Sequence, residues 1–332
     1  MSVLLLDDDA VRAHLDAATA VRAVRAALLS AHHDDLAAPP RVRAALGAGD
    51  LVITAGHLRS RQLFGFRAYD TLVGAEQLVA VWGTADGELR AVVHGVELGA
   101  RRTGAIGAVA VDAAARPGPV RVGLVRAGPQ AWTQLWALRA VREVTDAVVV
   151  ARHHDRAAAF ARRAAGELGV PARAVTAVED AVTDRDVVVV ATGSPTPVLD
   201  ADWLAPGTHL TTLGPKSTAR HEVPAALADR ARAVLTDSLA QSAGSGGSPL
   251  FPTDRLVSLG AVLAGAAPAR TGPDDLTVFS SVGLAGTEVA VAAALCEAVP
   301  RRGPSWRPRG CVRRAKRPCG AGAVRSTVRG HG

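Results

Sequence analysis

The sequence predicts an α/β protein with a Rossmann-type, doubly wound parallel sheet plus a second, α+β domain. Apolar, strand-like segments alternate with helical segments through the second part of the chain. The segment 186–192, DVVVVAT, is apolar almost throughout, as expected of a strand covered on both faces. Residues 120–150 have the pattern strand, Gly/Pro turn, helix and strand, with which dinucleotide-binding domains begin.

The elements follow in chain order from periodicity and turn residues. Apolar residues at helical spacing predict helices over 16–32, 98–111, 156–168 and 286–298. Short apolar runs fill 51–93, and the pair at 78–93 predicts a β-hairpin around Asp86-Gly87. We expect the parallel strands at 120–125, 147–150, 186–192, 209–213, 233–236 and 276–281, and a mobile polar loop at 241–248.

These elements predict three parts of the chain. Residues 1–117, joined by a C-terminal helix at 284–299, are expected to form the α+β domain, to which the family resemblance described below assigns substrate binding and dimerisation. Residues 118–283 are expected to form the NAD(P)-binding Rossmann domain. Residues 300–332 have no periodicity, much Gly and Pro, and charge of one sign, which predicts a disordered basic tail.

The tail accounts for the formal net charge of +7. From Arg301 onward there are ten basic residues and no acidic ones, which leaves 28 basic and 31 acidic residues in the rest of the chain. The tail is either an arm for an anionic partner such as nucleic acid or an extension without function; we prefer the second interpretation. Cys311 and Cys319 also lie there, at a spacing that does not suit a metal, so no metal site is expected.

A membrane span is not expected, because no run of about 18 apolar residues occurs. The apolar start at 3–6 is too short for a signal peptide and is followed directly by acidic residues. A cytoplasmic protein is therefore the expectation.

The turn at 126–131 is the first candidate for cofactor binding. In the pattern G-x-G-x-x-G/A, the middle glycine is Gly128 and the last position is Ala131, but Arg126 replaces the first glycine. The pattern alone is weak, since an ordinary strand–turn–helix without a ligand would look the same. Arg126 either crowds the pyrophosphate or adds a cation to it, and it strains the turn if its φ must be positive.

Several short motifs, in order, resemble the ornithine cyclodeaminase/μ-crystallin family over about residues 40–298. The resemblance implies an NAD(P)-dependent enzyme that acts on amino, imino or keto acids, and a homodimer built through the non-Rossmann domain. The matching motifs are Pro40-Arg41, Gly65-Phe66-Arg67-Ala68-Tyr69, Arg102-Thr103-Gly104-Ala105, Gly128-Pro129-Gln130-Ala131, Ala191-Thr192-Gly193-Ser194, Leu213-Gly214-Pro215-Lys216 and Phe279-Ser280-Ser281-Val282-Gly283-Leu284-Ala285.

The resemblance also assigns residues to the two ligands. Arg41, Arg67 and Arg102 are expected to bind the substrate carboxylate, since guanidinium is the best clamp for that group, and Val282 is expected beside them. Arg67 stands among small apolar residues, where a buried guanidinium needs an anionic partner. The residues expected to bind the cofactor are Thr103, Gly128, Pro129, Gln130, Arg152, His153, Thr192, Ser194, Leu213, Gly214 and Ser281.

Lys216 stands where the cyclodeaminases of the family carry an aspartate. An ammonium group cannot accept a proton, so cyclodeamination is disfavoured; Lys216 could instead be the general acid of an imine or carbonyl reduction. We expect the three arginines to lower its pKa. The chain has 36 arginines and two lysines, and Lys216 is the one lysine outside the tail. The alternatives are a loop lysine that contacts nothing and one that contacts a cofactor phosphate.

Cofactor choice is expected to depend on the residues after the second Rossmann strand. NAD-selective units place an acid there for the ribose 2′-hydroxyl, whereas this chain has Ala151-Arg152-His153. NADP(H) is therefore preferred, with NAD(H) as the alternative. The alternative interpretation is that Arg152 and His153 are solvated residues at the end of the strand that bind no cofactor.

The leading hypothesis is NAD(P)H-dependent reduction of a small cyclic imino acid or keto acid, or the reverse oxidation of the amino acid. The rival within enzymes is a cyclodeaminase-type lyase. The rival outside enzymes is a μ-crystallin-like protein that binds NADPH and a small carboxylate without turnover, which Arg126 would favour. Nucleic-acid binding through the tail is a third, less favoured class.

Overall fold

The computed structural model describes residues 3–72, 76–244 and 247–300, and Met1–Val299 form one compact unit. The predicted basic tail from 301, with Cys311 and Cys319, lies outside the described residues. Within the described residues, no helix is both long and apolar enough to cross a membrane.

An eight-stranded sheet, parallel throughout, confirms the predicted Rossmann-type architecture. Its order is β10-β9-β8-β11-β12-β17-β15-β16, so the winding reverses between β8 and β11. The central strands are buried over their whole length, which explains their unbroken apolar runs. The strands are β8 (Val120–Val125), β9 (Val144–Val150), β10 (Ala172–Val175), β11 (Val187–Val190), β12 (His209–Thr212), β15 (Ala233–Thr236), β16 (Leu256–Ser258) and β17 (Thr277–Ser280).

Helices connect these strands, as a parallel sheet requires. The expected helix 156–168 begins earlier, at His154, and its last turn widens into a π-helix at Ala164–Leu168. The helices of this part are α4 (Pro129–Leu138), α5 (His154–Arg163), α6 (Val178–Val182), α7 (Leu227–Arg230), α8 (Leu239–Ala243) and α9 (Leu259–Leu263), with short 3₁₀ turns at Ala201–Trp203 and Thr253–Arg255.

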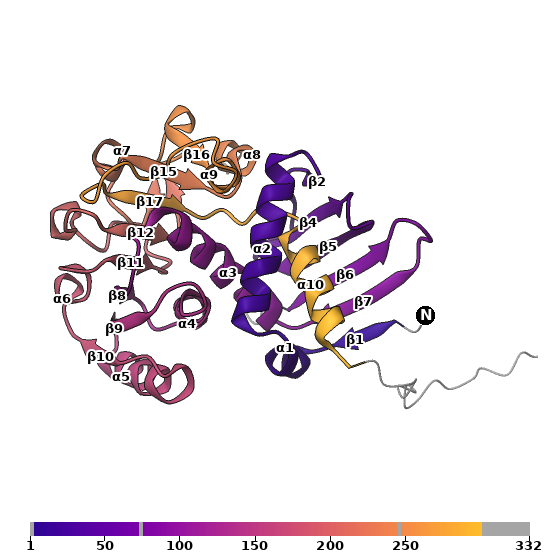
Figure 1. The fold of residues 1–332 in the computed structure, drawn as a ribbon, viewed down its shortest axis with the longest axis horizontal. Coiled ribbons are helices and arrows are strands. Elements are labelled where there is room, and N and C mark those ends of the chain that lie inside the picture. The colour runs from indigo at the N-terminus through magenta and orange to yellow at the C-terminus, as the bar shows by residue number, and fades with distance from the viewer. Residues whose placement is uncertain (1–2, 73–75, 245–246, 301–332) are drawn as a thin grey trace, which may run out of the picture. The chain divides into compact units, whose positions relative to one another are not determined.

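A second, mixed sheet contains the first part of the chain (Figure 1). Its order is β1-β7-β6-β5-β4-β2, with β3 also paired to β4, and all pairs except β1–β7 are antiparallel. The predicted hairpin around Asp86-Gly87 is confirmed as β6–β7, with Gly87 at a φ of +69°. The strands are β1 (Leu4–Leu6), β2 (Leu36–Ala37), β3 (Val42–Ala45), β4 (Asp50–Leu58), β5 (Leu63–Asp70), β6 (Gln77–Gly83) and β7 (Leu89–His94).

Four helices accompany this sheet: α1 (Asp8–His14), α2 (Ala17–His32), α3 (Glu97–Ala114) and α10 (Thr287–Ala298). The C-terminal helix α10 packs across β4–β7 and along α2 (Figure 1). Helix α3 contacts α2, α4 and the parallel strands β12 and β17. One apolar core therefore joins α2, α3 and α10 to Leu235 and Phe279 of the parallel sheet. The domain boundaries given above stay predictions.

One loop expectation was wrong. Residues 241–243 of the predicted loop 241–248 belong to α8, and the Ser238 side chain caps this helix by accepting from Gln241 N. A single turn of helix has no apolar periodicity for a sequence to display. Residues 245–246 lie outside the described residues.

The small residues of α3 allow α4 to pack unusually close to it. A Cβ atom on Gly104 would lie 2.1 Å from the backbone oxygen of Thr133, and one on Gly107 would lie 1.8 Å from Oε1 of Gln134. The amide of Gln134 in turn donates to the backbone oxygen of Thr103 (3.0 Å). This contact fixes the start of the Rossmann unit against the helix that carries Arg102.

Gly104→Ala should therefore destabilise the protein by about 1–3 kcal/mol, because a backbone atom of α4 must move. Gly166→Ala is the matched control: no atom lies within 4 Å of the added Cβ, and alanine restricts the unfolded chain. The free energy of unfolding, from urea titration, measures both. Equal effects of the two substitutions would contradict the close α3–α4 contact.

Candidate functional site

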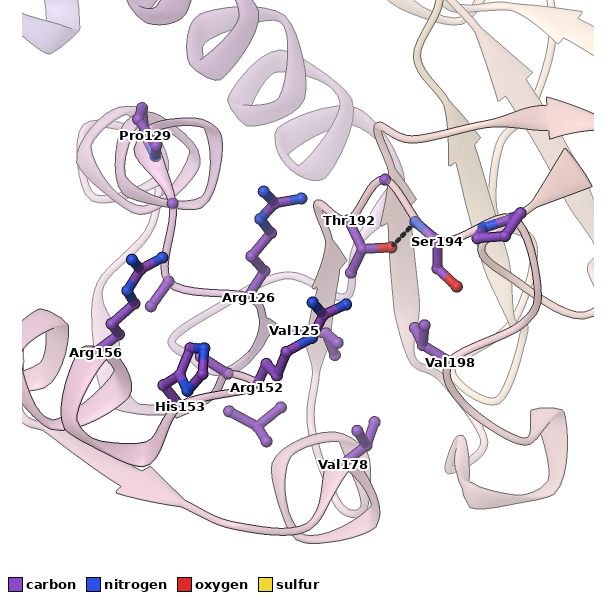
Figure 2. A pocket seen from close by; sticks show the side chains of 16 residues that line it. Val125, Arg126, Pro129, Arg152, His153, Arg156, Val178, Thr192, Ser194 and Val198 are labelled. Atoms are coloured by element: carbon purple, nitrogen blue, oxygen red, sulfur yellow. Dashed lines mark hydrogen bonds between the residues drawn. The ribbon is translucent and has the colours of Figure 1, made fainter.

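A cleft of about 780 Å³ opens at the carboxyl ends of β8, β9 and β11, where the winding of the parallel sheet reverses (Figure 2). This switch point is where open α/β sheets bind ligands. The cleft is lined by Val125, Arg126, Ala127, Gly128, Pro129, Val150, Ala151, Arg152, His153, Arg156, Val178, Thr192, Gly193, Ser194, Pro195 and Val198.

Six residues predicted to bind the cofactor share this cleft: Gly128, Pro129, Arg152, His153, Thr192 and Ser194. Gly128 is the N-cap of α4 and Pro129 its first residue, and no side chain caps the helix there. The N–H groups and positive dipole end of α4 thus face the cleft, as an anion site requires. Ser194 N donates to Thr192 Oγ1 (3.2 Å; Figure 2), which shapes the loop after β11.

The other predicted cofactor residues lie outside the cleft-lining set, and their roles stay predictions. Gln130 is exposed in the first turn of α4. Thr103 lies on α3, where its hydroxyl donates to Gly99 O (2.9 Å). Leu213 and Gly214 follow β12, and Ser281 follows β17.

Arg126 has the positive φ that the glycine pattern implied, +99°. For a residue with a Cβ this conformation costs about 1–3 kcal/mol. Its guanidinium reaches from the β8 loop toward the β11 loop: a Cβ on Gly193 would lie 3.8 Å from Arg126 Nη1. Figure 2 shows Arg126, Arg152 and Arg156 around the same cleft. Arg156, in the first turn of α5, was not predicted.

Two of the predicted substrate arginines meet a carboxylate of the chain itself. Glu288 of α10 has a fully buried side chain that pairs with Arg102 of α3 and with Arg67 of β5 (3.3 Å). Arg67 also donates to Gln77 Oε1 (2.6 Å) and stacks on the Tyr69 ring at 4.3 Å. The anionic partner that the sequence required for Arg67 is thus Glu288, which sequence reasoning missed.

Electrostatics within this cluster keep Glu288 ionised. Burial alone would raise the pKa of Glu288, but the charges of Arg102 and Arg67 hold it below its ordinary value. Burial, followed by repulsion from Arg102, lowers the pKa of Arg67. The signal for Glu288 was available, since it is the one acidic residue before Glu297 in the apolar run of the last helix.

Arg41 completes the predicted arginine group. Its Nη2 donates to the backbone oxygens of Val282 (2.8 Å) and Gly283 (3.4 Å) and to Gln241 Oε1 (2.9 Å). A Cβ on Gly283, whose φ is +79°, would lie 2.8 Å from Arg102 Nη1 and 3.6 Å from Arg41 Nη2. The structure therefore brings Arg41 and Arg102 together at the loop that contains Val282.

Lys216 begins the short strand β13 (Lys216–Ser217), which pairs with β14 (Arg220–His221). Its Nζ donates to Gly214 O (2.6 Å), so it is not a lysine that contacts nothing. Burial lowers its pKa to about 8; Glu222 and Asp237 act in the opposite direction, and Arg41 adds a smaller lowering effect. The low pKa was expected, but its main cause is burial rather than three arginines.

Two further buried carboxylates near Lys216 escaped sequence reasoning. Asp237, directly after β15, accepts from the backbone N–H groups of Val282 (2.8 Å) and Leu284 (2.7 Å). Glu222, after β14, accepts hydrogen bonds from the loops that follow β11 and β12. Asp237 could have been found from its position at the end of an apolar strand; Glu222 lies in a polar loop that offers no such signal.

Known proteins are similar to this chain in sequence and in fold. The model of the ornithine cyclodeaminase/mu-crystallin family matches residues 2–302, and the chain belongs to that family. It is 30% identical to the iminosuccinate reductase of Paracoccus denitrificans over 80% of this chain and 86% of that protein. It is 29% identical to the Delta(1)-pyrroline-2-carboxylate reductase of Bacillus cereus over 65% of this chain and 69% of that one.

A Rhizobium meliloti relative is 36% identical over 58% of this chain, and the alignment spans 60% of that relative. Among solved structures, the iminosuccinate reductase of Paracoccus denitrificans in complex with NAD+ aligns with a TM-score of 0.79 at 27% identity. That alignment covers 89% of this chain and 96% of the reductase. Family and fold class are therefore as predicted.

The Glu288 cluster yields a test of stability. Glu288→Gln leaves two buried arginines without a counter-charge and should cost about 3–5 kcal/mol of unfolding free energy at neutral pH. Because the folded-state pKa of Glu288 is depressed, its contribution is present above the unfolded pKa and disappears as pH falls through the folded pKa. The difference from wild type should therefore shrink in acid, which urea titration at several pH values measures.

Glu297→Gln on the same helix is the matched control. Glu297 pairs with Arg61 at the surface, where an ion pair contributes about 0–1 kcal/mol. A loss from Glu288→Gln no larger than that of the control would show that the buried cluster does not stabilise the fold.

Proposed function

We propose that this protein is an NADP(H)-dependent oxidoreductase that reduces a small imino or keto acid, or oxidises the corresponding amino acid. The observation that carries this proposal is Lys216, a partly buried lysine after β12 whose Nζ donates to Gly214 O (2.6 Å) and whose pKa is lowered by burial to about 8. An acid with that pKa can donate a proton near neutral pH. The two relatives named as imino-acid reductases support the same reaction class.

The arginine group is suited to the substrate carboxylate. Arg41 Nε and Arg102 Nε are buried and have no hydrogen-bond partner among the described residues. Buried donors of this kind need an acceptor, and a carboxylate can take two of them at once. Glu288 neutralises part of the charge and fixes Arg67 and Arg102, so that the carboxylate meets a prearranged clamp.

In the mechanism we propose, Arg41, Arg67 and Arg102 orient the substrate by its carboxylate. The residues that line the cleft would hold a reduced nicotinamide cofactor, whose chemistry when bound would be to supply a hydride for the imine or carbonyl carbon. Lys216 Nζ donates a proton to the imine nitrogen or keto oxygen, and the Gly214 carbonyl orients that ammonium group. Lys216 returns to its charged form from solvent, since its pKa is about 8.

Preference for NADP(H) rests on the charges of the cleft. Arg126, Arg152 and Arg156 line it, and none of the lining residues is acidic. A carboxylate after β9 would recognise the ribose 2′-hydroxyl of NAD, whereas an arginine accommodates a 2′-phosphate. The related iminosuccinate reductase was solved with NAD+, so the preference proposed for this chain differs from the cofactor in that complex. NAD(H) is the alternative.

Arg126 favours a second candidate, a non-catalytic protein that binds NADPH and a small carboxylate. Its guanidinium lies across the cleft between the β8 and β11 loops, where it can retain a dinucleotide or hinder its entry. A cyclodeaminase is less well supported, because Lys216 occupies the position of the proton-accepting aspartate. Measured turnover of an imino or keto acid with NADPH distinguishes the oxidoreductase from the non-catalytic binding protein.

We also propose a homodimer through the outer face of the mixed sheet. Phe64 stacks on Trp82, and Phe66 stacks on the same ring. Phe64 and Val42 are exposed on this sheet although they are large and apolar. An apolar face of this kind is typical of a protein interface.

Substitution of Lys216 tests the proposed acid. Lys216→Gln should lower kcat for reduction of Δ1-pyrroline-2-carboxylate by about 10²–10⁴-fold, since no acid remains. In the wild type, kcat should be level below pH 8 and fall above it, because the protonated form is lost there. NADPH absorbance follows the rate. Unchanged kcat with weaker NADPH binding would instead assign Lys216 to a cofactor phosphate.

Substitution of Arg152 tests cofactor choice. Arg152→Ala should weaken NADPH binding by about 10- to 100-fold, the loss of one charged hydrogen bond, while NADH binding changes little. Fluorescence titration measures both dissociation constants. Arg162→Ala, on the exposed side of α5 and outside the cleft, is the control and should bind both like the wild type. An equal loss for the two nucleotides would contradict recognition of the 2′-phosphate.

A further inference from the structure

Glu222 is a fully buried carboxylate at the end of the β13–β14 hairpin. It accepts five hydrogen bonds from the described residues, all of 2.5–2.9 Å. Its Oε2 binds the N–H and hydroxyl of Thr192, in the loop after β11. Its Oε1 binds the Thr212 hydroxyl and the N–H groups of Leu213 and Gly214, at the end of β12. One carboxylate therefore clamps two adjacent loops.

The charge of Glu222 is held by donors rather than by a salt bridge. None of the ion pairs between described residues includes Glu222. Burial of a carboxylate is costly unless several N–H or O–H groups point at it, and hydrogen bonds to an ionised acceptor are the strong ones. Five converging donors meet that requirement only while both loops keep this conformation.

Gly214 links Glu222 to Lys216. The N–H of Gly214 donates to Glu222 (2.5 Å), and its carbonyl accepts from Lys216 Nζ (2.6 Å). A Cβ on Gly214 would lie 2.2 Å from Thr192 O and 2.4 Å from Glu222 Oε2, so no other residue fits between the loops. The position of the Lys216 ammonium group thus depends on the peptide that Glu222 holds.

We propose that Glu222 is a positioning residue for the reaction: it fixes the two loops at the cofactor side of the site and, through Gly214, aims Lys216. This inference rests on the proposed function, in which Lys216 is the general acid. Glu222 need not touch substrate or cofactor to act in this way. The charges of Glu222, Asp237 and Arg41 also act on the pKa of Lys216.

Two substitutions separate its charge from its position. Glu222→Gln replaces one oxygen by an amide group, so one loop would meet a donor in place of its acceptor. It also removes a negative charge that favours protonated Lys216, and the Lys216 pKa should fall. Glu222→Asp keeps the charge and both oxygens but withdraws them by one methylene.

The scarcity of lysine makes the titration direct. The chain has two lysines, Lys216 and Lys316, so protein labelled with ¹³C at the lysine ε-carbon gives two side-chain signals, and Lys216→Arg identifies one of them. In the full-length wild type, the Lys216 signal should titrate near pH 8. In Glu222→Gln its midpoint should fall by about one pH unit, and the alkaline limb of kcat should move with it.

Asp186→Asn is the control for loss of a hydrogen-bonded, partly buried carboxylate. Asp186 precedes β11 at the opposite end of the sheet and accepts from Arg121 N (2.8 Å) and Arg116 (2.5 Å). It should lower stability but leave the Lys216 midpoint and the pH profile of kcat unchanged. Glu222→Gln should lower kcat about 100-fold, with Glu222→Asp between it and the wild type, as expected of a misaligned acid.

Two results together would overturn the proposal. In Glu222→Gln the Lys216 signal would titrate with the wild-type midpoint, and kcat would fall no more than it does in Asp186→Asn. If Glu222→Gln does not fold, Glu222→Asp decides: a Lys216 midpoint kept near pH 8 with a lower kcat supports positioning, and wild-type kcat overturns it. A wild type that never oxidises NADPH with any imino acid contradicts the proposed function, whereas the lysine titration still measures whether Glu222 acts on Lys216.

Discussion

A single buried carboxylate, Glu288, joins parts of the chain that are far apart in sequence. It lies between Arg67 of the mixed sheet and Arg102 of α3, and it belongs to the last helix. Any one of these charges, buried without its partners, would cost several kcal/mol. Strand β5, helix α3 and helix α10 therefore pack together stably only when all three charges meet. Because the same contact places Arg102 beside Gly283, the packing of α10 determines where the proposed substrate clamp points.

Two other buried carboxylates organise the loops at the carboxyl ends of the parallel strands. Asp237 holds the backbone after β17, and Glu222 holds the backbone after β11 and β12. These loops leave the sheet with N–H groups that have no ladder partner, and buried donors must be satisfied. The protein satisfies them with its own acids, which gives the loops defined shapes and keeps negative charge close to Lys216.

Positive charge is concentrated where an anionic ligand is expected. Outside the basic tail the chain has more acidic than basic residues, yet the cleft is lined by Arg126, Arg152 and Arg156 and by no acid. Arg126 retains a φ of +99° that glycine would adopt without strain. Strain that persists beside a cleft is consistent with the proposed role of this cleft, in which a phosphate group would be the natural partner of the Arg126 side chain.

The sequence by itself determined the class of fold and most of the longer elements, because apolar periodicity and turn residues are local properties; short elements such as α8 were not predicted. The hairpin at Asp86-Gly87 and the buried parallel strands followed from such patterns, whereas the cleft at the switch point depends on the order of the strands in the sheet. Tertiary structure alone decided the partners: Glu288 meets Arg102 across 186 positions, and Glu222 meets Thr192 across 30. No local pattern encodes which acid meets which donor, since that depends on how helices and loops pack over the sheets.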